Sequence, residues 1–427
     1  MVEVEASGRY IARTLHLLSG STPEHANVVR ILVYGQSISQ QEWWLAVRQG
    51  LQARYPQARL VMENRAIGGF HSTRLLKTVE ADVIPFYPDL ILFQDYGPED
   101  DYEAIIRLIR QRTTAEIAVQ TDHYVSAQEN AWHDRHCQVW LPELCARYQV
   151  HLLDVRERWK QHLAENQLNP EALLSDQIHL NQAGNRLMAQ IVLDHLVPQP
   201  EAGPDPQGLV IRKAAGKDFP APTPILELPF TGSRVDLVLT GKAALDIRVD
   251  GQRPSSFPDV YLAQTPRVVG VEGRPPRVGY PVRVKVNAPY QPEAWTLSVE
   301  QVIDDGREVR FALYSASGGF EGRGTSAEDF TAASGRIALH VADWFTREAP
   351  EFFDALPAVQ PGQSIYWEVV CMSRDTVETQ DAIGGVITAI QGVPNGLHRL
   401  RLESRDGAAL PLAAVVIYCP PIIVTED

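Results

Sequence analysis

Residues 29–44 read VRILVYGQSISQQEWW and pass from an apolar segment through a Gly-Gln-Ser turn into an amphipathic segment. The β-branched residues of 29–35 favour a buried strand, and the apolar residues of 40–55 recur at helical spacing. A strand that ends at Gly35 and a helix that begins soon afterwards leave Ser37 in the connecting turn. The Ser37 hydroxyl is therefore expected at the carboxyl end of the strand.

The same alternation of strand and helix continues through the first 200 residues. Near-continuous apolar strands separated by helices predict a parallel sheet covered on both faces. Ligands of such sheets bind at the carboxyl ends of the strands, beside the switch in strand order. The expected strands are 29–35, 58–66, 89–95, 115–122 and 150–155, and the expected helices are 40–55, 72–84, 101–113, 136–148 and 181–196.

The second half of the chain has a different character. After a Pro/Gly-rich stretch, short alternating runs punctuated by Gly, Asn, Asp and Pro predict an all-β sandwich. One jelly-roll-like sheet pair with an inserted β module is our hypothesis, and two smaller sandwiches are the alternative. The predicted parts are an N-terminal segment (1–27), an α/β domain (28–198), a linker (199–226) and a β-sandwich region (227–427), the last divided into a jelly roll (227–275 and 362–427) and an insertion (280–345).

Composition limits the possible partners and surroundings of the protein. Its 427 residues, of which 44% are hydrophobic and 22% charged, are typical of a globular protein with two or three domains. The net charge of −14 argues against a nucleic-acid partner. No apolar run approaches the roughly 20 residues that span a bilayer, so no membrane partner is expected. The N-terminus shows no signal peptide, which leaves a cytoplasmic protein or a secreted one that has lost its leader.

The four cysteines show no Cys-x-x-Cys spacing. They are interpreted as free thiols or small buried residues, with a Cys137–Cys145 bridge left open.

Four short motifs in the α/β half carry the residue types of a catalytic site. Three of them follow predicted strands, and the fourth precedes the last predicted helix. They are Gly35-Gln36-Ser37, Asn64-Arg65-Ala66-Ile67-Gly68-Gly69, Gly97-Pro98-Glu99-Asp100 and Ser175-Asp176-Gln177-Ile178-His179-Leu180-Asn181.

The spacing of Asp176 and His179 suits acid–base chemistry. A carboxylate three residues before a histidine can accept the Nδ1–H of the imidazole, which leaves Nε2 free to act as a general base. A serine hydroxyl becomes a good nucleophile when such a base takes its proton. If the last loop lies beside the first strand, Ser37, His179 and Asp176 form a catalytic triad.

These motifs, in this order, resemble those of the SGNH, or GDSL-type, hydrolases over residues 28–198. The resemblance implies a flavodoxin-like three-layer α/β/α domain with a five-stranded parallel sheet. It also implies that Ser37 is the nucleophile, that Asp176 and His179 complete the triad, and that the N–H groups of Ser37 and Gly69 help to form the oxyanion hole. The chemistry needs no metal and no cofactor.

Two positions depart from the pattern of the family. Gln36 replaces the usual acid before the serine, and Glu99 replaces the asparagine that usually contributes to the oxyanion hole. Loss of one such donor typically costs about 100- to 1000-fold in rate unless another group substitutes. Gln94, at the end of the third strand, is the proposed substitute, and His123, after the fourth strand, is the alternative. The expected substrate contacts are Gln36, Gly68, Arg65, Glu99 and His123.

Several of these residues also have structural interpretations. Ser37 and Asp176 are both suited to cap a helix. His133 and His136 have the spacing of a metal pair, but a solvated helix face is the preferred interpretation. One of Trp43 and Trp44 is expected in the core and the other at the border of the substrate cleft. For Trp295, Trp344 and Trp367, core packing is preferred over sugar stacking.

Three functions are compatible with the sequence. The leading hypothesis is a serine esterase that removes O-acetyl or other short acyl groups from a carbohydrate; the carbohydrate rests on the resemblance, because related enzymes with β-sandwich regions often act on sugars. The second is a lipase, thioesterase or aryl esterase that acts on smaller or more apolar esters. The third is a weakly active or inactive α/β scaffold with a glycan-binding β region. The oligomeric state is left open.

Overall fold

The computed structural model describes residues 4–126, 130–198, 202–268, 279–303, 307–345, 359–379 and 385–422. The chain divides into two compact units, one formed mainly by residues up to Gly208 and the other mainly by residues from Leu209 on. None of the described helices combines the length and the apolarity needed to cross a membrane.

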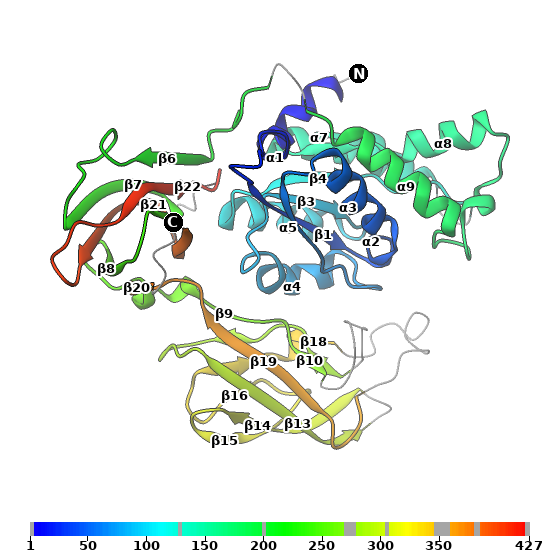
Figure 1. The fold of residues 1–427 in the computed structure, drawn as a ribbon. Coiled ribbons are helices and arrows are strands. Elements are labelled where there is room, and N and C mark those ends of the chain that lie inside the picture. The colour runs from blue at the N-terminus through cyan, green and yellow to red at the C-terminus, as the bar shows by residue number, and fades with distance from the viewer. Residues whose placement is uncertain are drawn as a thin grey trace. The chain divides into compact units, whose positions relative to one another are not determined.

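The first unit is built on a parallel five-stranded sheet in the order β2-β1-β3-β4-β5 (Figure 1), which confirms the predicted α/β fold. The strand order reverses between β1 and β3, so the carboxyl ends of these two strands mark the switch point of the sheet. The strands are β1 (Val28–Gly35), β2 (Arg59–Asn64), β3 (Leu90–Gln94), β4 (Glu116–Gln120) and β5 (His151–Leu153). The helices are η1 (Val4–Ile11), α1 (Ala12–Ser19), α2 (Ser37–Gln40), α3 (Trp43–Arg54), α4 (Ser72–Val83), α5 (Glu99–Arg112), α6 (Asn130–Arg135), the π-helical η2 (His136–Trp140), α7 (Leu141–Tyr148), α8 (Val155–Glu165), η3 (Pro170–Leu173) and α9 (Gln182–His195).

The N-terminal segment is part of the core of this unit. Ile11, Leu15 and Leu18 are at most 2% exposed and pack in the same apolar cluster as β1 and α9. The Glu116 carboxylate accepts the backbone N–H groups of Arg13 and Thr14 at 2.9 and 2.8 Å, which ties the start of α1 to β4. Residues before the predicted start at 28 therefore contribute to the core of the α/β unit.

The second unit consists of antiparallel sheets that form a β-sandwich, as predicted. One six-stranded sheet has the order β20-β8-β21-β7-β22-β6, and in another β10-β19-β13-β14-β15 lie in order with β9 beside β19. The first contains β6 (Val210–Ala214), β7 (Ile225–Leu239), β8 (Ala244–Val249), β20 (Thr376–Glu378), β21 (Val386–Ser404) and β22 (Leu412–Tyr418). The second contains β9 (Tyr261–Ala263), β10 (Arg267–Val268), β13 (Glu293–Ile303), β14 (Glu308–Ser315), β15 (Gly319–Thr325) and β19 (Ser364–Cys371). Smaller elements are β11 (Tyr280–Pro281), β12 (Lys285–Val286), β16 (Phe330–Thr331), β17 (Ile337–Leu339), β18 (Trp344–Phe345), η4 (Pro254–Ser256), η5 (Pro258–Val260) and η7 (Val341–Asp343).

The strand pairing corrects two predictions about this region. The chain leaves the first sheet after β8 and returns to it at β20, so the inserted strands extend from Tyr261 to Cys371 rather than over 280–345. The predicted linker also contains β6, which pairs with β22. Alternating apolar residues indicate that a segment is a strand, but they do not specify its partner.

Buried aromatic and sulfur-containing residues follow the predictions. Trp295, Trp344 and Trp367 are 1–3% exposed, which confirms core packing. Trp43 lies in the core, whereas Trp44 is half-buried. All four cysteines are free.

Candidate active site

The turn after β1 requires glycine at position 35. Gly35 has a φ of 145°, and a Cβ there would lie 1.9 Å from the Gln94 carbonyl oxygen on the neighbouring β3. No other residue tolerates both conditions. This close approach of β1 and β3 places Ser37, the first residue of α2, at the switch point of the sheet.

Ser37 and His179, which are 142 positions apart in the sequence, lie within hydrogen-bond distance of each other. The Ser37 Oγ lies 3.0 Å from His179 Nε2, and His179 Nδ1 lies 2.8 Å from Asp176 Oδ2. Because an ionised carboxylate only accepts hydrogen bonds, Nδ1 carries a proton and donates it to Asp176. In a neutral imidazole, Nε2 then faces the Ser37 hydroxyl as an acceptor. The structure thus brings together the three residues of the predicted triad.

The Asp176 carboxylate also shapes the loop that carries His179. Its Oδ1 accepts the backbone N–H groups of Ile178 and His179, both at 2.7 Å. Partial burial raises the pKa of Asp176, but the hydrogen bonds from the His179 and Ile178 backbone and from the His179 ring outweigh this effect and lower it to about 2. The carboxylate is therefore ionised throughout the working range of an esterase. Asn181, rather than Asp176, caps α9.

Two side chains from elsewhere in the unit hold this loop in place. The Gln41 amide accepts the Leu180 N–H at 2.9 Å and donates to the Leu180 carbonyl at 3.2 Å, which joins the end of α2 to the loop. His123 Nε2 lies 2.8 Å from the Ile178 carbonyl oxygen. A carbonyl only accepts, so Nε2 of His123 carries the proton. Burial lowers the pKa of His123 to about 4, against the raising effect of the Ile178 carbonyl, which keeps this ring neutral.

The second predicted motif borders the nucleophile. A Cβ on Gly68 would lie 3.6 Å from the Ser37 Cβ, which places this residue directly beside the serine. Gly69 has a φ of 74°, in a turn closed by the Phe70 N–H and the Ile67 carbonyl at 3.1 Å. The Arg74 guanidinium donates to the Gly69 carbonyl at 3.0 Å and thereby orients the adjoining peptide.

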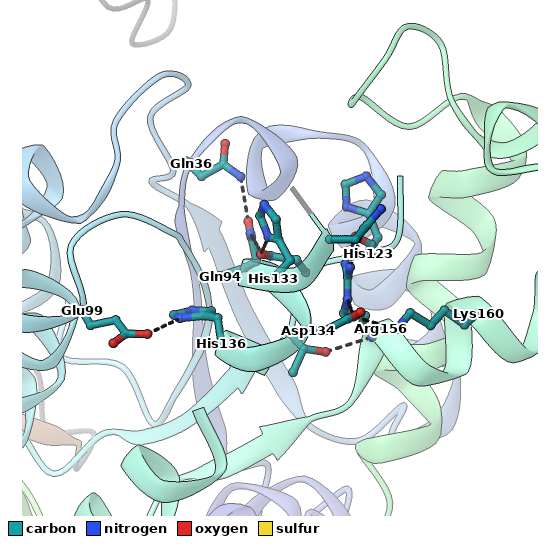
Figure 2. A network of polar contacts seen from close by, with 12 residues as sticks. Gln36, Gln94, Glu99, His123, His133, Asp134, His136, Arg156 and Lys160 are labelled. Carbon is teal, nitrogen blue, oxygen red and sulfur yellow. Dashed lines mark hydrogen bonds and ion pairs between the residues drawn. The ribbon is translucent and has the colours of Figure 1, made fainter. Parts of the chain in front are cut away.

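Gln36 and Gln94 are buried and bonded to each other. Gln36 Nε2 donates to Gln94 Oε1 at 3.1 Å (Figure 2), and Gln94 Nε2 donates to Asp122 Oδ1 at 2.8 Å. The Gln94 amide group is thus bonded to Asp122 and not to Ser37. The predicted role of Gln94 in the oxyanion hole requires a rearrangement of these bonds.

Glu99 and Arg65 make ion pairs with neighbouring residues. Glu99 accepts from Arg135 at 2.8 Å and lies 3.3 Å from His136 Nδ1 (Figure 2). Arg65 pairs with Glu63 at 2.7 Å. These contacts occupy the charged groups of both residues in the absence of substrate.

The predicted solvated face formed by His133 and His136 is wrong. His133 is 9% exposed and bonds to Asp122 at 2.7 Å. His136 is fully buried, and its ring stacks between Trp132 and Trp140. Helical spacing indicates which residues share a face of a helix, but it does not indicate whether that face is exposed. Here both histidines are buried inside the α/β unit. Among the described residues, no group of three or more His, Cys, Asp or Glu side chains is arranged to hold a metal.

Two further residues that support the site were not identified from the sequence. Asp122 follows β4, so the strand-end argument that singled out Ser37 was sufficient to find it. Arg156 is fully buried and donates to the His123 carbonyl at 3.0 Å and to Asp134 at 2.7 Å (Figure 2). Its place at the start of α8 gave no signal, because the partners of an arginine are not visible in a sequence.

One of three comparisons with known proteins identifies the family of the α/β unit. A comparison with curated protein sequences found no match. A comparison with solved structures returned an acetylxylan esterase from Geobacillus stearothermophilus (21% identity, TM-score 0.36, covering 39% of this chain and 94% of that chain). It also returned the acetyl xylan esterase AlAXEase (18% identity, TM-score 0.36, covering 40% of this chain and 100% of that chain). The model of the GDSL-like lipase/acylhydrolase family matches residues 32–187, from the first strand to the last helix of the unit. This part of the chain belongs to the GDSL-like lipase/acylhydrolase family, and the protein is a carboxylic ester hydrolase.

Proposed function

We propose that the protein is a serine esterase that hydrolyses short acyl esters, O-acetyl groups above all, on a carbohydrate. The observation that carries the proposal is the line of hydrogen bonds from Ser37 Oγ through His179 to Asp176, at 3.0 and 2.8 Å. A nucleophile, a base and an orienting carboxylate in this geometry are the requirements of acyl transfer.

The first half of the reaction forms an acyl-enzyme. Ser37 Oγ attacks the ester carbonyl carbon while His179 Nε2 accepts the hydroxyl proton, and Asp176 stabilises the resulting imidazolium. The tetrahedral intermediate collapses, the bond to the alcohol oxygen breaks, and His179 donates its proton to the departing alcohol. The acyl group is left on Ser37 as an ester.

The second half repeats these steps with water. His179 Nε2 accepts a proton from a water molecule as the water oxygen attacks the acyl carbon. The bond to Ser37 Oγ then breaks, the proton returns to Ser37, and the carboxylic acid leaves. The N–H groups of Ser37 and Gly69 are the proposed donors to the oxyanion in both halves.

The surroundings of Ser37 support a short acyl group and a hydrophilic alcohol. The two side chains bonded to the Ser37 hydroxyl among the described contacts, Gln36 and His179, are both polar. The side chain of Asp176 is 57% exposed and that of His179 is 39% exposed, so water surrounds much of the triad. Long acyl chains bind where apolar surface is buried, whereas a sugar bearing an acetyl group suits a polar, open site. The β unit is a candidate for holding a polymeric substrate near the site.

The direct test is acetate release from acetylated polysaccharides and oligosaccharides by the wild-type protein and by Ser37→Ala. The wild type is expected to release acetate from at least one substrate, and the variant at least about 10⁴-fold more slowly. An active Ser37→Ala protein would contradict the mechanism. A wild-type Ser37 that is not labelled by a fluorophosphonate probe would favour an inactive scaffold.

A series of p-nitrophenyl esters separates the proposed function from the lipase or thioesterase alternative. Activity is expected to fall steeply beyond the acetyl and propionyl esters. A maximum at longer acyl chains would favour the alternative.

A further inference from the structure

A continuous line of buried side chains leads from α6 to the nucleophile. His133 bonds to Asp122 at 2.7 Å, Gln94 to Asp122 at 2.8 Å, and Gln36 to Gln94 at 3.1 Å. The Gln36 side-chain oxygen then accepts both the Ser37 N–H at 2.7 Å and the Ser37 hydroxyl at 2.8 Å. The four residues before Ser37 are at most 9% exposed, so water does not compete strongly for these bonds. We call these four side chains the amide relay (Figure 2 shows its glutamines and histidine).

The direction of every bond in the amide relay follows from Asp122. Burial raises the pKa of Asp122, but the hydrogen bond and charge of His133 outweigh it and hold the pKa below its usual value. An ionised Asp122 only accepts, so Gln94 must turn its NH₂ toward it and its oxygen toward Gln36. Gln36 must then donate to Gln94 and present its own oxygen to Ser37. An acid at position 36, as in the usual Gly-Asp-Ser motif, could not make the bond to Gln94 while ionised.

The Gln36 side-chain oxygen, at the end of the amide relay, accepts a hydrogen bond from a backbone N–H that the reaction needs. The Ser37 N–H is one of the two proposed oxyanion donors, and Gln36 holds it at 2.7 Å. Gln36 also competes with His179 for the only proton of the Ser37 hydroxyl, because both are acceptors within 3.0 Å of it.

We propose that Gln36 is a positioning residue whose side-chain oxygen accepts the Ser37 N–H in the free enzyme and so keeps this N–H from the substrate. The amide relay holds the Gln36 oxygen in place, and it therefore sets how easily the Ser37 N–H changes its partner to the substrate's carbonyl oxygen. This inference rests on the proposed esterase function. Free enzyme and reacting enzyme then differ in the partner of one backbone N–H: the Gln36 oxygen in the former and the developing oxyanion in the latter.

Two variants remove the Gln36 oxygen as acceptor of the Ser37 N–H by different routes. Gln36→Met keeps the length of the side chain and removes its oxygen. Asp122→Asn leaves Gln36 in place but reverses the amide relay: an Asn oxygen that accepts from His133 presents its NH₂ to Gln94. Gln94 then turns its oxygen toward position 122, and Gln36 turns its NH₂ toward Ser37.

The measurement is the inhibition constant of phenylboronic acid, whose tetrahedral adduct with Ser37 carries an oxygen that mimics the oxyanion. Both variants are expected to bind it about three- to tenfold more tightly than the wild type, the value of one freed hydrogen bond. Gln161→Met is the matched control, because the Gln161 amide bonds only to Glu165 on the exposed face of α8 among the described contacts, and it is expected to leave the constant unchanged.

Equal or weaker inhibition in either folded variant would overturn the proposal, since a purely structural role of Gln36 predicts weaker binding in both. Thermal unfolding reports whether each variant folds, and if Gln36→Met does not, Asp122→Asn decides the matter alone. A wild-type protein that neither hydrolyses p-nitrophenyl acetate nor reacts with a fluorophosphonate would instead contradict the proposed function itself.

Discussion

His123 Nε2 lies 2.8 Å from the carbonyl oxygen of Ile178, the residue that directly precedes His179. The ring of His123 is buried against Trp159, and Arg156 holds its backbone carbonyl. The His123 side chain, after β4, thus ties down the loop that carries His179, the proposed general base. From this position we expect His123 to act through His179 rather than on the substrate, in contrast to the substrate contact expected from the sequence.

Replacement of His123 is therefore expected to slow the reaction without weakening substrate binding. His123→Phe removes the donor to Ile178 and should lower kcat by about 10- to 100-fold, with a small change in KM. His123→Gln keeps an N–H at similar reach and should restore most of the rate. Steady-state kinetics with p-nitrophenyl acetate measure both effects, and equal losses in the two variants would exclude the proposed hydrogen bond as the cause.

The same histidine makes stability depend on pH. The pKa of His123 falls to about 4 in the folded protein, where burial is the main cause, Arg156 and His179 also lower it, and the Ile178 carbonyl and Asp122 raise it. Because the unfolded state binds this proton near pH 6.5, the stabilisation is complete above that pH and is lost as the pH falls toward 4. The loss should reach up to about 3 kcal/mol.

Denaturant unfolding at pH 7 and pH 4.5 measures this linkage. His123→Gln should lose less stability than the wild type between the two values. His195, whose pKa burial lowers to about 3, contributes with the same sign in both proteins and cancels in the comparison. An identical pH dependence in the two proteins would show that His123 titrates normally.

Asp176→Asn is expected to abolish most of the activity while leaving the fold intact. The Asn oxygen can still accept the backbone N–H groups of Ile178 and His179, but its NH₂ then faces His179 Nδ1. This favours the imidazole tautomer with the proton on Nε2, which cannot accept the Ser37 proton. A fall in kcat of about 10⁴-fold is expected, and thermal unfolding should still show a cooperative transition. Asp194→Asn, at an exposed carboxylate on α9, is the control and should retain full activity.

Gly35→Ala tests the approach of β1 to β3. The new Cβ would lie 1.9 Å from the Gln94 carbonyl, so the variant should lose several kcal/mol of stability or fail to fold. Gly407→Ala is the matched control, since Gly407 also has a positive φ, of 72°, but no atom lies within 4 Å of the added Cβ. It should lose only about 1 kcal/mol. Thermal unfolding compares them, and a wild-type-like Tm for Gly35→Ala would contradict the packing described for the turn.

Local patterns were sufficient to predict the α/β unit. Apolar strands separated by amphipathic helices specify a parallel sheet, and a polar residue after a strand in such a sheet lies at its functional edge. Ser37 was singled out by its place after a strand, Asp176 and His179 by their spacing, and all three by the family resemblance; their catalytic roles stay a prediction. The burial of Trp295 and Trp367 was likewise predictable from residue type alone.

Sequence order alone thus determined the layered α/β architecture, the β-rich second half and the residues expected to perform the chemistry, since these depend on periodicity and on spacings of a few residues. The tertiary structure decided which distant groups meet: the pairing of β9 with β19, the bond of His123 to the loop of His179, and the line from His133 to Gln36. Those contacts join residues that are tens of positions or more apart, or that lie on a face whose direction no helical pattern specifies. Hydrogen-bond valence then fixed the direction of each bond in the amide relay, once folding had placed an ionised Asp122 at its base.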